Sequence, residues 1–178
     1  MGNFFNHLHT VNKHRRLVRK HCFKVGLYWQ GLTHDLSKYS WTEFSVGVKY
    51  WQGVRSPNVT QRRTIGYSTA WMHHKGRNKH HYEYWTDYSE TTFNHLEPVK
   101  MPPKYFVEMV MDRIAACKVY KGKDYNDGSS LDYLLSRDKE NFMNKETYED
   151  LFKVLTMLKD EGEEKTFKYL KEVYLTEK

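Results

Sequence analysis

One short segment combines two metal-ligating side chains with an anion-binding one: His34 and Asp35 are adjacent, and Lys38 follows three residues later. A neutral imidazole beside a carboxylate is a ligand pair for a divalent cation. If the segment is helical, Lys38 lies on the same side as His34 and Asp35, because residues three and four apart are neighbours on a helix. A His-Asp pair alone is common on protein surfaces, so the segment indicates a metal site only if the rest of the chain supplies further ligands.

A second group of candidate ligands surrounds Gly76. Four histidines and three cations fall within nine residues, namely His73, His74, Lys75, Arg77, Lys79, His80 and His81. The alternatives are a solvated basic turn and a loop that binds a metal and an anion. Adjacent histidines point in different directions, so one of each pair can bind a metal while its neighbour packs or reaches a substrate.

A third candidate, Asp112, lies in a helix predicted from Pro103 to about Tyr120, where prolines suit the first turn. It shares an apolar face with residues such as Met109 and Ala116, which lie three and four positions away. A carboxylate on such a face is costly unless it is paired or bound to a metal. Pairing with Arg113 or a capping contact is the alternative to metal binding.

The first helix is predicted from Phe4 to Tyr28, with one stripe of inward residues at helical spacing: Phe4, His7, Val11, His14, Val18, His21, Val25 and Tyr28. Each histidine on this stripe could simply be buried and bonded to a carbonyl. His14 and His21 are about 10 Å apart along the axis at ~1.5 Å per residue. At most one of them therefore belongs to a given metal centre.

The other predicted elements are also helical. Thr33 is a plausible N-cap for a helix to about Tyr50, and further helices are expected at 61–74, 129–135, 145–160 and 163–175. Residues 86–101 look irregular, and no strand pattern of useful length is present. The prediction is an all-α, single-domain helical bundle over residues 1–178. Its metal-site core spans about residues 10–120, and supporting helices span about residues 129–175.

Composition excludes several classes of protein. Of 178 residues, 39% are hydrophobic and 16% aromatic, as in a globular chain and not a disordered one. No apolar run approaches the ~20 residues of a membrane span, so no membrane association is expected. The first residues show no secretory pattern, and Cys22 and Cys117 are far apart. Two reduced thiols in the cytoplasm are the expected reading.

Charge is unevenly distributed along the chain. The net charge is +7, but residues 1–100 hold 15 Lys/Arg against 6 Asp/Glu, whereas residues 101–178 hold 14 against 16. All ten histidines lie between His7 and His95. The basic half suits an anionic partner. The asymmetry predicts a site built mainly by the first half of the chain.

In chain order, the candidates resemble the HD-domain superfamily of metal-dependent phosphohydrolases, which has a helical His, a His-Asp doublet and a distant helical Asp. An added His and a His-His pair before the last Asp look like its two-metal branch. The resemblance is closer to a family of small uncharacterised bacterial and phage proteins with this fold, and covers about residues 10–135. Its motifs are His14 to Val18, His34 to Lys38, His74 to His81 with Asn78, and Glu108 to Asp112. Where that family has Pro-Glu-His after the His pair, this chain has Tyr82-Glu83-Tyr84.

The resemblance implies a role for each matching residue. The first metal would be held by His14, His34, Asp35 and Asp112, and the second by His74 with His80 or His81, with Asp35 bridging the two. Catalysis would rest on Asp35 and Lys38, and substrate binding on Lys38, Arg77, Asn78 and Lys79. Imidazole-rich sites suit Mn, Fe, Co, Ni or Zn, as one or two ions.

The predicted function is hydrolysis of a phosphomono- or phosphodiester in a nucleotide-like or other phosphorylated small molecule, by metal-activated water. Two alternatives stay open. A basic nucleic-acid-binding module without catalysis would use phosphate contacts and stacking, and some two-iron proteins of the HD type activate oxygen. The sequence leaves open the substrate, the number of metals, the choice between His14 and His21, and the oligomeric state.

Overall fold

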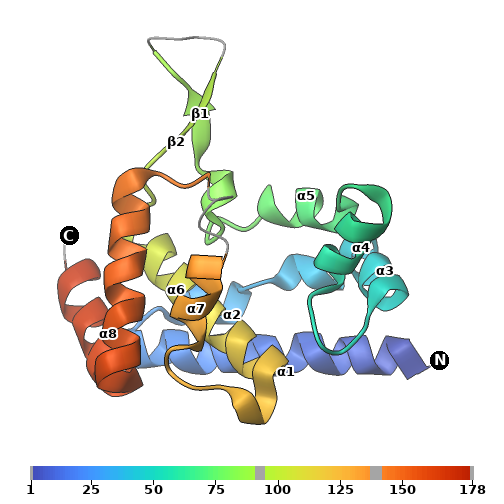
Figure 1. Cartoon of the computed structure of the whole chain (residues 1–178), viewed down its shortest axis with the longest axis horizontal. Coiled ribbons are helices and arrows are strands. Elements are labelled where there is room, and N and C mark those ends of the chain that lie inside the picture. Colours follow the sequence, from blue (N-terminus) through green and yellow to red (C-terminus); the bar gives the residue numbers. More distant parts are fainter. Residues whose placement is uncertain (1, 91–94, 137–141, 177–178) are drawn as a thin grey trace.

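Helix α1 (Gly2–Val25) lies along the base of the molecule and carries the other helices, as Figure 1 shows for the computed structural model. The structure describes residues 2–90, 95–136 and 142–176. Above the N-terminal half of α1 lie α3, α4 and α5, and above its C-terminal half lie α6, α7 and α8. The bounds of these helices are α2 Tyr28–Thr33, α3 Trp41–Tyr50, α4 Pro57–Ile65, α5 Thr69–Lys75, α6 Pro103–Lys121, α7 Ser129–Ser136 and α8 Lys145–Tyr169. The all-α, single-domain prediction is confirmed.

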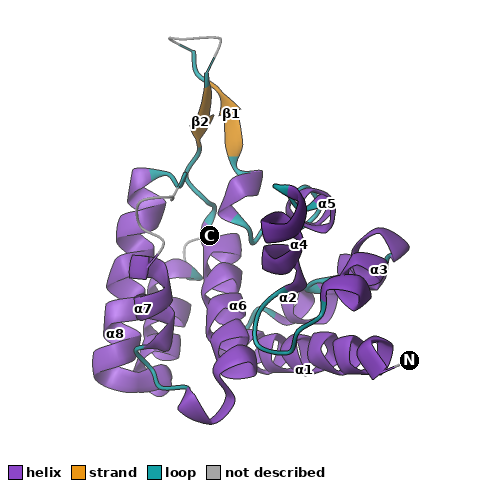
Figure 2. Ribbon diagram, turned by 45° about the vertical axis from the view of Figure 1, so that its right-hand side comes forward, coloured by secondary structure: helices purple, strands orange, loops and turns teal. Residues whose placement is uncertain are grey.

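A two-stranded ribbon projects from this helical body (Figure 2). Its strands, β1 (Thr86–Tyr88) and β2 (Leu96–Pro98), are antiparallel, and Thr86 pairs with Pro98. The expectation of an irregular segment over 86–101 was therefore wrong in part. Three-residue strands are too short to show an alternating pattern of hydrophobic and polar residues.

The apolar core lies between α6, α7, α8 and the C-terminal half of α1. Helix α6 is buried on nearly every side, which is typical of a central helix. Fully enclosed core residues include Val18, Ile114, Leu134, Leu155 and Leu158. This packing fixes the position of α6 against α1, and so the relative position of the side chains that both helices present to the site.

The predicted inward stripe of α1 is buried from His7 to Val25, but Phe4 and Tyr28 are exposed. Gly26 ends the helix, since its φ of 88° belongs to the left-handed region that glycine adopts readily. The amide of Leu27 then donates to the carbonyl of Cys22, 2.9 Å away, and turns the chain. The predicted continuation to Tyr28 was wrong for this reason.

The segment around His34 differs most from the predicted helix. Thr33 ends α2 and caps nothing, His34 is extended, and Asp35 has a φ of 56°. One 3-10 turn, Leu36–Tyr39, follows before Ser40 leads into α3. The predicted N-cap at Thr33 was wrong, because Thr33 ends α2 and the left-handed backbone of Asp35 separates it from the 3-10 turn and from α3.

Two further helix boundaries depend on glycine. Gly66, with a φ of 88°, separates α4 from α5, so the predicted helix over 61–74 is two helices. Gly162 is the non-helical residue within α8, close to the break predicted between 160 and 163. A π-helical turn, Leu170–Tyr174, follows α8. Within the described ranges, no helix is both long and apolar enough to span a lipid bilayer.

Candidate metal centre

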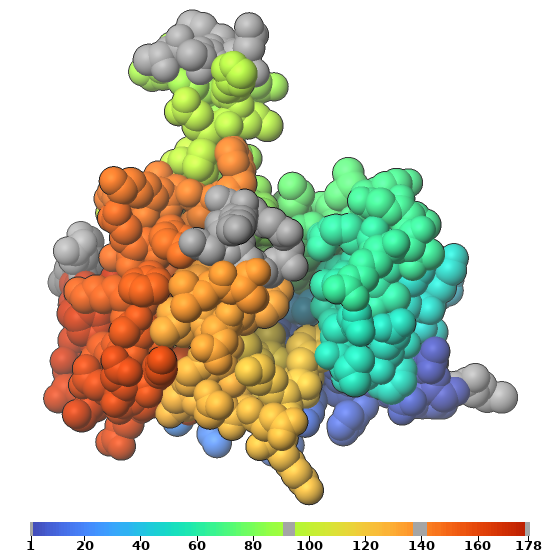
Figure 3. Space-filling model, viewed as in Figure 1, coloured from blue at the N-terminus to red at the C-terminus, as the bar shows by residue number. Residues whose placement is uncertain are grey.

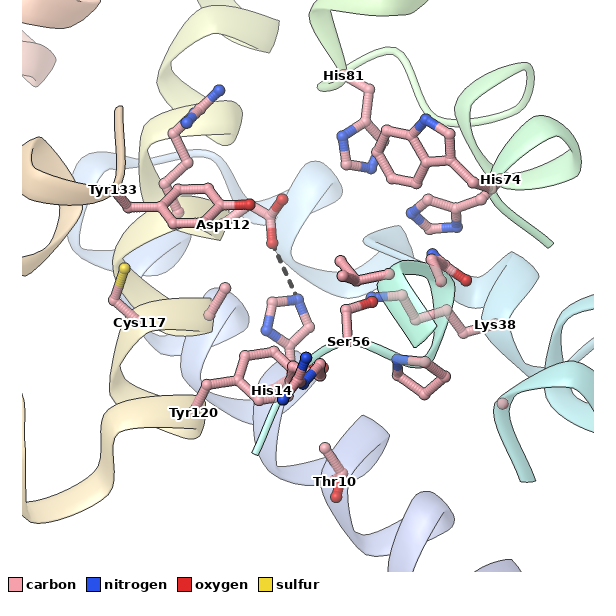
Figure 4. A pocket seen from close by; sticks show the side chains of 18 of the residues that line it. Thr10, His14, Lys38, Ser56, His74, His81, Asp112, Cys117, Tyr120 and Tyr133 are labelled. Carbon is pink, nitrogen blue, oxygen red and sulfur yellow. Dashed lines mark ion pairs between the residues drawn. The ribbon is translucent and has the colours of Figure 1, made fainter. Parts of the chain in front are cut away.

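Five separate elements bring their histidines and carboxylates to one buried place. Helix α1 supplies His14, and the turn after α2 supplies His34 and Asp35. The end of α5 and the segment after it supply the remaining histidines, and α6 supplies two acids. We call this set the histidine–carboxylate cluster; its members are His14, His34, Asp35, His74, His80, His81, Glu108 and Asp112. The cluster lies beside the cleft drawn in Figure 4.

Asp35 lies at the centre of the cluster and faces two sets of histidines with its two oxygens. Its Oδ2 is 3.4 Å from Nε2 of both His14 and His34. Its Oδ1 is 3.2 Å from Nε2 of His74 and 3.3 Å from Nε2 of His80. One carboxylate can therefore serve two neighbouring cation positions.

Asp112 closes the first of these sets from the opposite side. Its Oδ1 is 3.0 Å from Nε2 of His14, the ion pair dashed in Figure 4, and 3.7 Å from Nε2 of His34. Its Oδ2 is 3.9 Å from Nε2 of His80. The possible ligand groups are His14, His34, Asp35 and Asp112; Asp35, His74, His80 and His81; and His34, His80 and Glu108. Within each group the ligand atoms lie within 4.8 Å of one another.

Three histidine rings of the cluster are held from behind by carboxylates. Nδ1 of His34 and Nδ1 of His80 lie 2.9 Å and 3.2 Å from Oε1 of Glu108. Nδ1 of His74 lies 2.8 Å from Oε2 of Glu43. A carboxylate that accepts the Nδ1 proton leaves Nε2 with a free lone pair, and metal-bound histidines are oriented in this way.

Several polar atoms of the cluster are buried without a hydrogen bond of acceptable geometry to any described residue. They are Nε2 of His14, His34, His80 and His81, and both carboxylate oxygens of Asp35. Burying such atoms without a partner is costly, and native proteins rarely do so. All of these atoms point into one small volume, so a cation would satisfy them together.

The spacing and chemistry of these atoms fit a transition metal. Two ligand atoms bound at ~2.1 Å to one ion are about 3.0 Å apart at a right angle and about 3.4 Å apart at a tetrahedral angle. The shortest contacts of Asp35 and Asp112 with the histidines, 3.0 to 3.4 Å, match that range. Mixed imidazole and carboxylate donors suit Mn, Fe, Co, Ni or Zn better than the oxygen-only preference of Ca or Mg.

The electrostatics of the cluster couple its histidines to its acids. Burial works against the charge of His80, but Asp35 and Glu108 outweigh it and raise the pKa of the imidazole to about 10. Burial also opposes ionisation of Asp35, yet His34 and Lys38 hold the pKa of its carboxyl well below the usual range. Without a metal, protons on the histidines thus balance the acids, and a metal must displace those protons to bind.

Lys38 contacts the cluster from the cleft. Its Nζ is 2.7 Å from Oδ2 of Asp35, and its side chain is 30% exposed. Burial opposes its charge, but Asp35 and Asp112 raise its pKa, so it is a permanent cation beside the ligands. Figure 4 shows Lys38, His14, His74, His81 and Asp112 around a common space.

Two of the other three residues predicted to bind substrate lie elsewhere. Arg77 and Lys79 are exposed and do not line the cleft; Arg77 bonds to the carbonyl of His73, and Lys79 lies over the rings of Tyr84 and Tyr105. The turn after α5 directs them away from the cluster. The amide of Asn78 instead lies within the site, where it donates to Oγ of Ser37 and to the carbonyl of His74.

The structure separates the three histidines on the inward stripe of α1. His14 is in the cluster, whereas His21 packs edge-on against Phe167, with ring centroids 5.4 Å apart. His7 lies close to Gly47, where a Cβ would come within 2.0 Å of Nε2 of His7. Burial is the main cause that lowers the pKa of both His7 and His21 to about 4. Of the pair left open by spacing, His14 is the one placed beside the acids.

Sequence reasoning missed the two orienting carboxylates, Glu43 and Glu108. Glu43 holds His73 and His74 together, with Nδ1 distances of 2.7 Å and 2.8 Å. Glu108 was quoted only as part of a motif, although it lies one helical turn before Asp112 and shares its face. That spacing was the available signal for Glu108. For Glu43 the only hint in the sequence was an acidic residue among the apolar residues of a predicted helix.

The chain matches a known family over residues 3–157, which is most of its length. That family is described only as a family of unknown function, DUF5662. No curated protein and no solved structure matches the chain. The family description states no activity and no HD domain. The resemblance to the HD-domain superfamily therefore stays a prediction. The helical fold and the histidine–carboxylate cluster are compatible with it.

Proposed function

The chain belongs to the DUF5662 family of unknown function, and we propose that it is a metal-dependent hydrolase that cleaves a phosphate ester of a small, nucleotide-like molecule. The proposal rests on one observation. In the described part of the chain, four imidazole nitrogens and both oxygens of one carboxylate are buried close to one another, most of them in ion pairs, without hydrogen bonds of acceptable geometry. A helical bundle that needed only stability would not keep such a group.

The ligand set supports two ions more than one. His14, His34 and Asp112 would hold the first ion, and His74, His80 and His81 the second, with Asp35 shared between them. Bound ions of this kind lower the pKa of water to near neutrality and polarise phosphoryl oxygens, which promotes attack on phosphorus. The preference for Mn, Fe, Co, Ni or Zn follows from the donors.

The chain's own residues would bind and orient the substrate. Lys38 keeps its positive charge and reaches the cleft beside Asp35, so it would pair with a non-bridging phosphate oxygen. Glu43 and Glu108 would keep the histidine rings fixed while the substrate binds, because each accepts Nδ1 protons from behind. The burial of His34, Asp35 and His74 would keep bulk water away from the ligand atoms.

The rival functions make different demands on the cluster. A nucleic-acid-binding module would use the exposed basic face of α1 and would have no need of buried imidazoles gathered around buried carboxylates. An oxygen-activating di-iron enzyme would use the same ligands, so only the reaction that it catalyses distinguishes it from a hydrolase. We propose a hydrolase and not a di-iron enzyme because the cleft beside the cluster carries cations that can bind phosphate, such as Lys38.

The test begins with the metal itself. The protein is purified, analysed for metal content, stripped with a chelator and reloaded with Mn, Co, Fe or Zn before phosphomono- and phosphodiesters are screened. We expect bound transition metal on purification, a higher melting temperature on reloading and metal-dependent hydrolysis, either of a phosphomonoester to phosphate or of a phosphodiester to a monoester. His34→Gln should abolish all three, whereas His9→Gln, at an exposed site on α1, should abolish none. Absence of metal, of stabilisation and of turnover with every ion would overturn the proposal, and oxygen consumption in place of hydrolysis would favour the di-iron alternative.

A further inference from the structure

The cleft beside the cluster extends well beyond the metal ligands. Its volume is about 930 Å³, at the upper end of the ~300–1,000 Å³ typical of small-molecule sites. Figure 3 shows the molecule hollowed between the segment of α4 and that of α6 and α7, with α1 deep between them. A single phosphate group over the cluster would leave most of this space empty.

One wall of the cleft carries three arginines that have no acidic partner among the described residues. Arg55, Arg62 and Arg63 come from α4 and the residue before its N-cap, and all three line the cleft. Arg55 and Arg62 are half-buried and Arg63 is exposed. Within residues 2–90, 95–136 and 142–176, none of them forms an ion pair. Three guanidinium groups that line the same cleft repel one another, so an anion bound in the cleft would relieve that repulsion.

The opposite wall adds further positive charge from α6. Arg113 and Lys121 line the cleft, and Nε of Arg113 is shielded from solvent without an acceptor among the described residues. The three carboxylates in the described lining do not balance these cations. Glu43 and Asp112 already face histidines of the cluster, and Glu83 is the remaining one. The cleft is therefore cationic on both sides and metal-ligating at its floor.

Aromatic side chains complete the outer part of the cleft. Tyr133 and Phe142 line it and are 50% and 48% exposed. The ring of Tyr120 lies on the same side as Tyr133 in Figure 4, across from Lys38. Exposed aromatic faces beside cations are the surroundings in which a nucleobase stacks while its phosphates are neutralised.

We infer that this cleft binds a nucleoside di- or triphosphate, with one phosphate at the cluster and the others between Arg62, Arg63 and Arg113. Each guanidinium group can bind one phosphate through two parallel hydrogen bonds. Several guanidinium groups in one cleft therefore favour a chain of phosphates over a single phosphate. The base would rest on Tyr133 or Phe142. The cleavage of such a molecule rests on the proposed function above, but its binding does not.

The test measures binding by calorimetry on the full chain, both stripped of metal and reloaded with Mn. The probes are a non-hydrolysable nucleoside triphosphate, the matching monophosphate and inorganic tripolyphosphate. We expect the triphosphate to bind at least about 10-fold more tightly than the monophosphate, since each charged hydrogen bond contributes a tenfold or greater factor. Tripolyphosphate should bind more weakly than the nucleoside triphosphate because it cannot stack.

The matched variants remove the same charge from two places. R62Q/R63Q should weaken triphosphate binding by about 10- to 100-fold and change monophosphate binding by less than about 3-fold. R16Q/R19Q, on the exposed face of α1 outside the cleft, should change neither. Equal losses in both variants, or none in R62Q/R63Q, would overturn the inference. Equal affinity for tripolyphosphate and the nucleoside triphosphate would overturn its nucleoside part.

Turnover assays keep this inference separate from the proposed function. If charge-dependent triphosphate binding is found but no ester is cleaved with any metal, the hydrolase proposal fails and the binding site stands. If esters are cleaved at equal rates with one, two or three phosphates, and R62Q/R63Q leaves KM unchanged, the hydrolase proposal stands and this inference fails.

Discussion

The histidine–carboxylate cluster and the apolar core are both largely buried and share helix α6, but they are buried for opposite reasons. One side of α6 presents Glu108 and Asp112 to the cluster, and the other presents Val110 and Ile114 to the core. Removing the apolar side chains from water stabilises the fold by roughly 1.5–3 kcal/mol each. Removing the polar ones costs free energy unless something binds them.

This difference teaches where to look for function in a helical bundle. Buried apolar groups need no further partner, whereas buried imidazoles whose Nε2 atoms form no well-aligned hydrogen bond to any described residue do. Substitutions in the core are therefore expected to change the stability of the fold, and substitutions in the cluster to change metal binding. Few substitutions are expected to change both. The predictions below test that separation, beginning with the largest expected effect.

Asp112→Asn keeps the size of a ligand side chain and removes its charge. We expect kcat/KM of the metal-loaded protein to fall by on the order of 10³-fold or more, equivalent to roughly 4 kcal/mol, with loss of metal by elemental analysis. Asp132→Asn, on the exposed side of α7, should leave both unchanged. Full metal content and turnover in Asp112→Asn would remove Asp112 from the site.

Leu155→Ala makes the matching change in the core. Leu155 is fully buried in α8, so its truncation should lower the free energy of unfolding by about 2–5 kcal/mol, measured by urea denaturation. The metal content of the folded fraction should stay the same. Leu135→Ala, at a half-exposed site on α7, serves as the control, with a change of about 0.5 kcal/mol or less expected. If Leu155→Ala also lost metal, the core and the cluster would not be separable.

His21 is a histidine on the core side of α1, and it should behave as a core residue. Burial lowers its pKa to about 4, so between pH 6.5 and 4 the unfolded chain binds a proton that the folded chain does not. Stability is then lost as pH falls through that window, by roughly 2–4 kcal/mol from this residue. In chelator, His21→Gln should show a flatter loss of stability from pH 7 to 4 than wild type.

The control for this pH effect is His9→Gln, which removes an exposed histidine from the same helix. It should keep the wild-type dependence of unfolding free energy on pH. An unchanged slope in His21→Gln would mean that acid sensitivity comes from the cluster and not from the core side of α1.

Glu108→Gln tests whether the carboxylates behind the histidines matter. The change weakens the contacts at 2.9 Å and 3.2 Å with Nδ1 of His34 and His80. Metal affinity should fall by about 10- to 100-fold, as for other residues that orient metal ligands, and competition with a chelator would measure it. Glu149→Gln, exposed on α8, should not alter the affinity. Wild-type affinity in Glu108→Gln would show that core packing alone orients the rings.

Sequence periodicity predicted the parts of the fold in which one face of a helix is buried. The stripe of α1 from His7 to Val25 and the span of α6 follow from 3.6-residue spacing and from prolines at the start. The left-handed backbone at Asp35 could not be predicted, because a residue other than glycine rarely adopts it. The ribbon over 86–98 was missed because three paired residues carry too little pattern.

The candidate site was predictable as a set of residue types but not as a geometry. Spacing along α1 showed that His14 and His21 could not share an ion, but only packing against α6 places His14 beside Asp112. Spacing gave no sign that Arg77 points outward or that Arg62 lines the cleft. These orientations depend on turns whose direction is set by tertiary contacts, not by local propensity.

The backbone at Asp35 limits which amino acids this position can tolerate. A φ of 56° strains most side chains, and glycine or asparagine would accept it most readily. Glycine would relax the turn and delete both oxygens, while alanine or glutamate would carry the strain. Of these replacements, asparagine alone retains the shape of the loop without the negative charge. It therefore separates the effect of the backbone conformation at position 35 from the effect of the carboxylate charge.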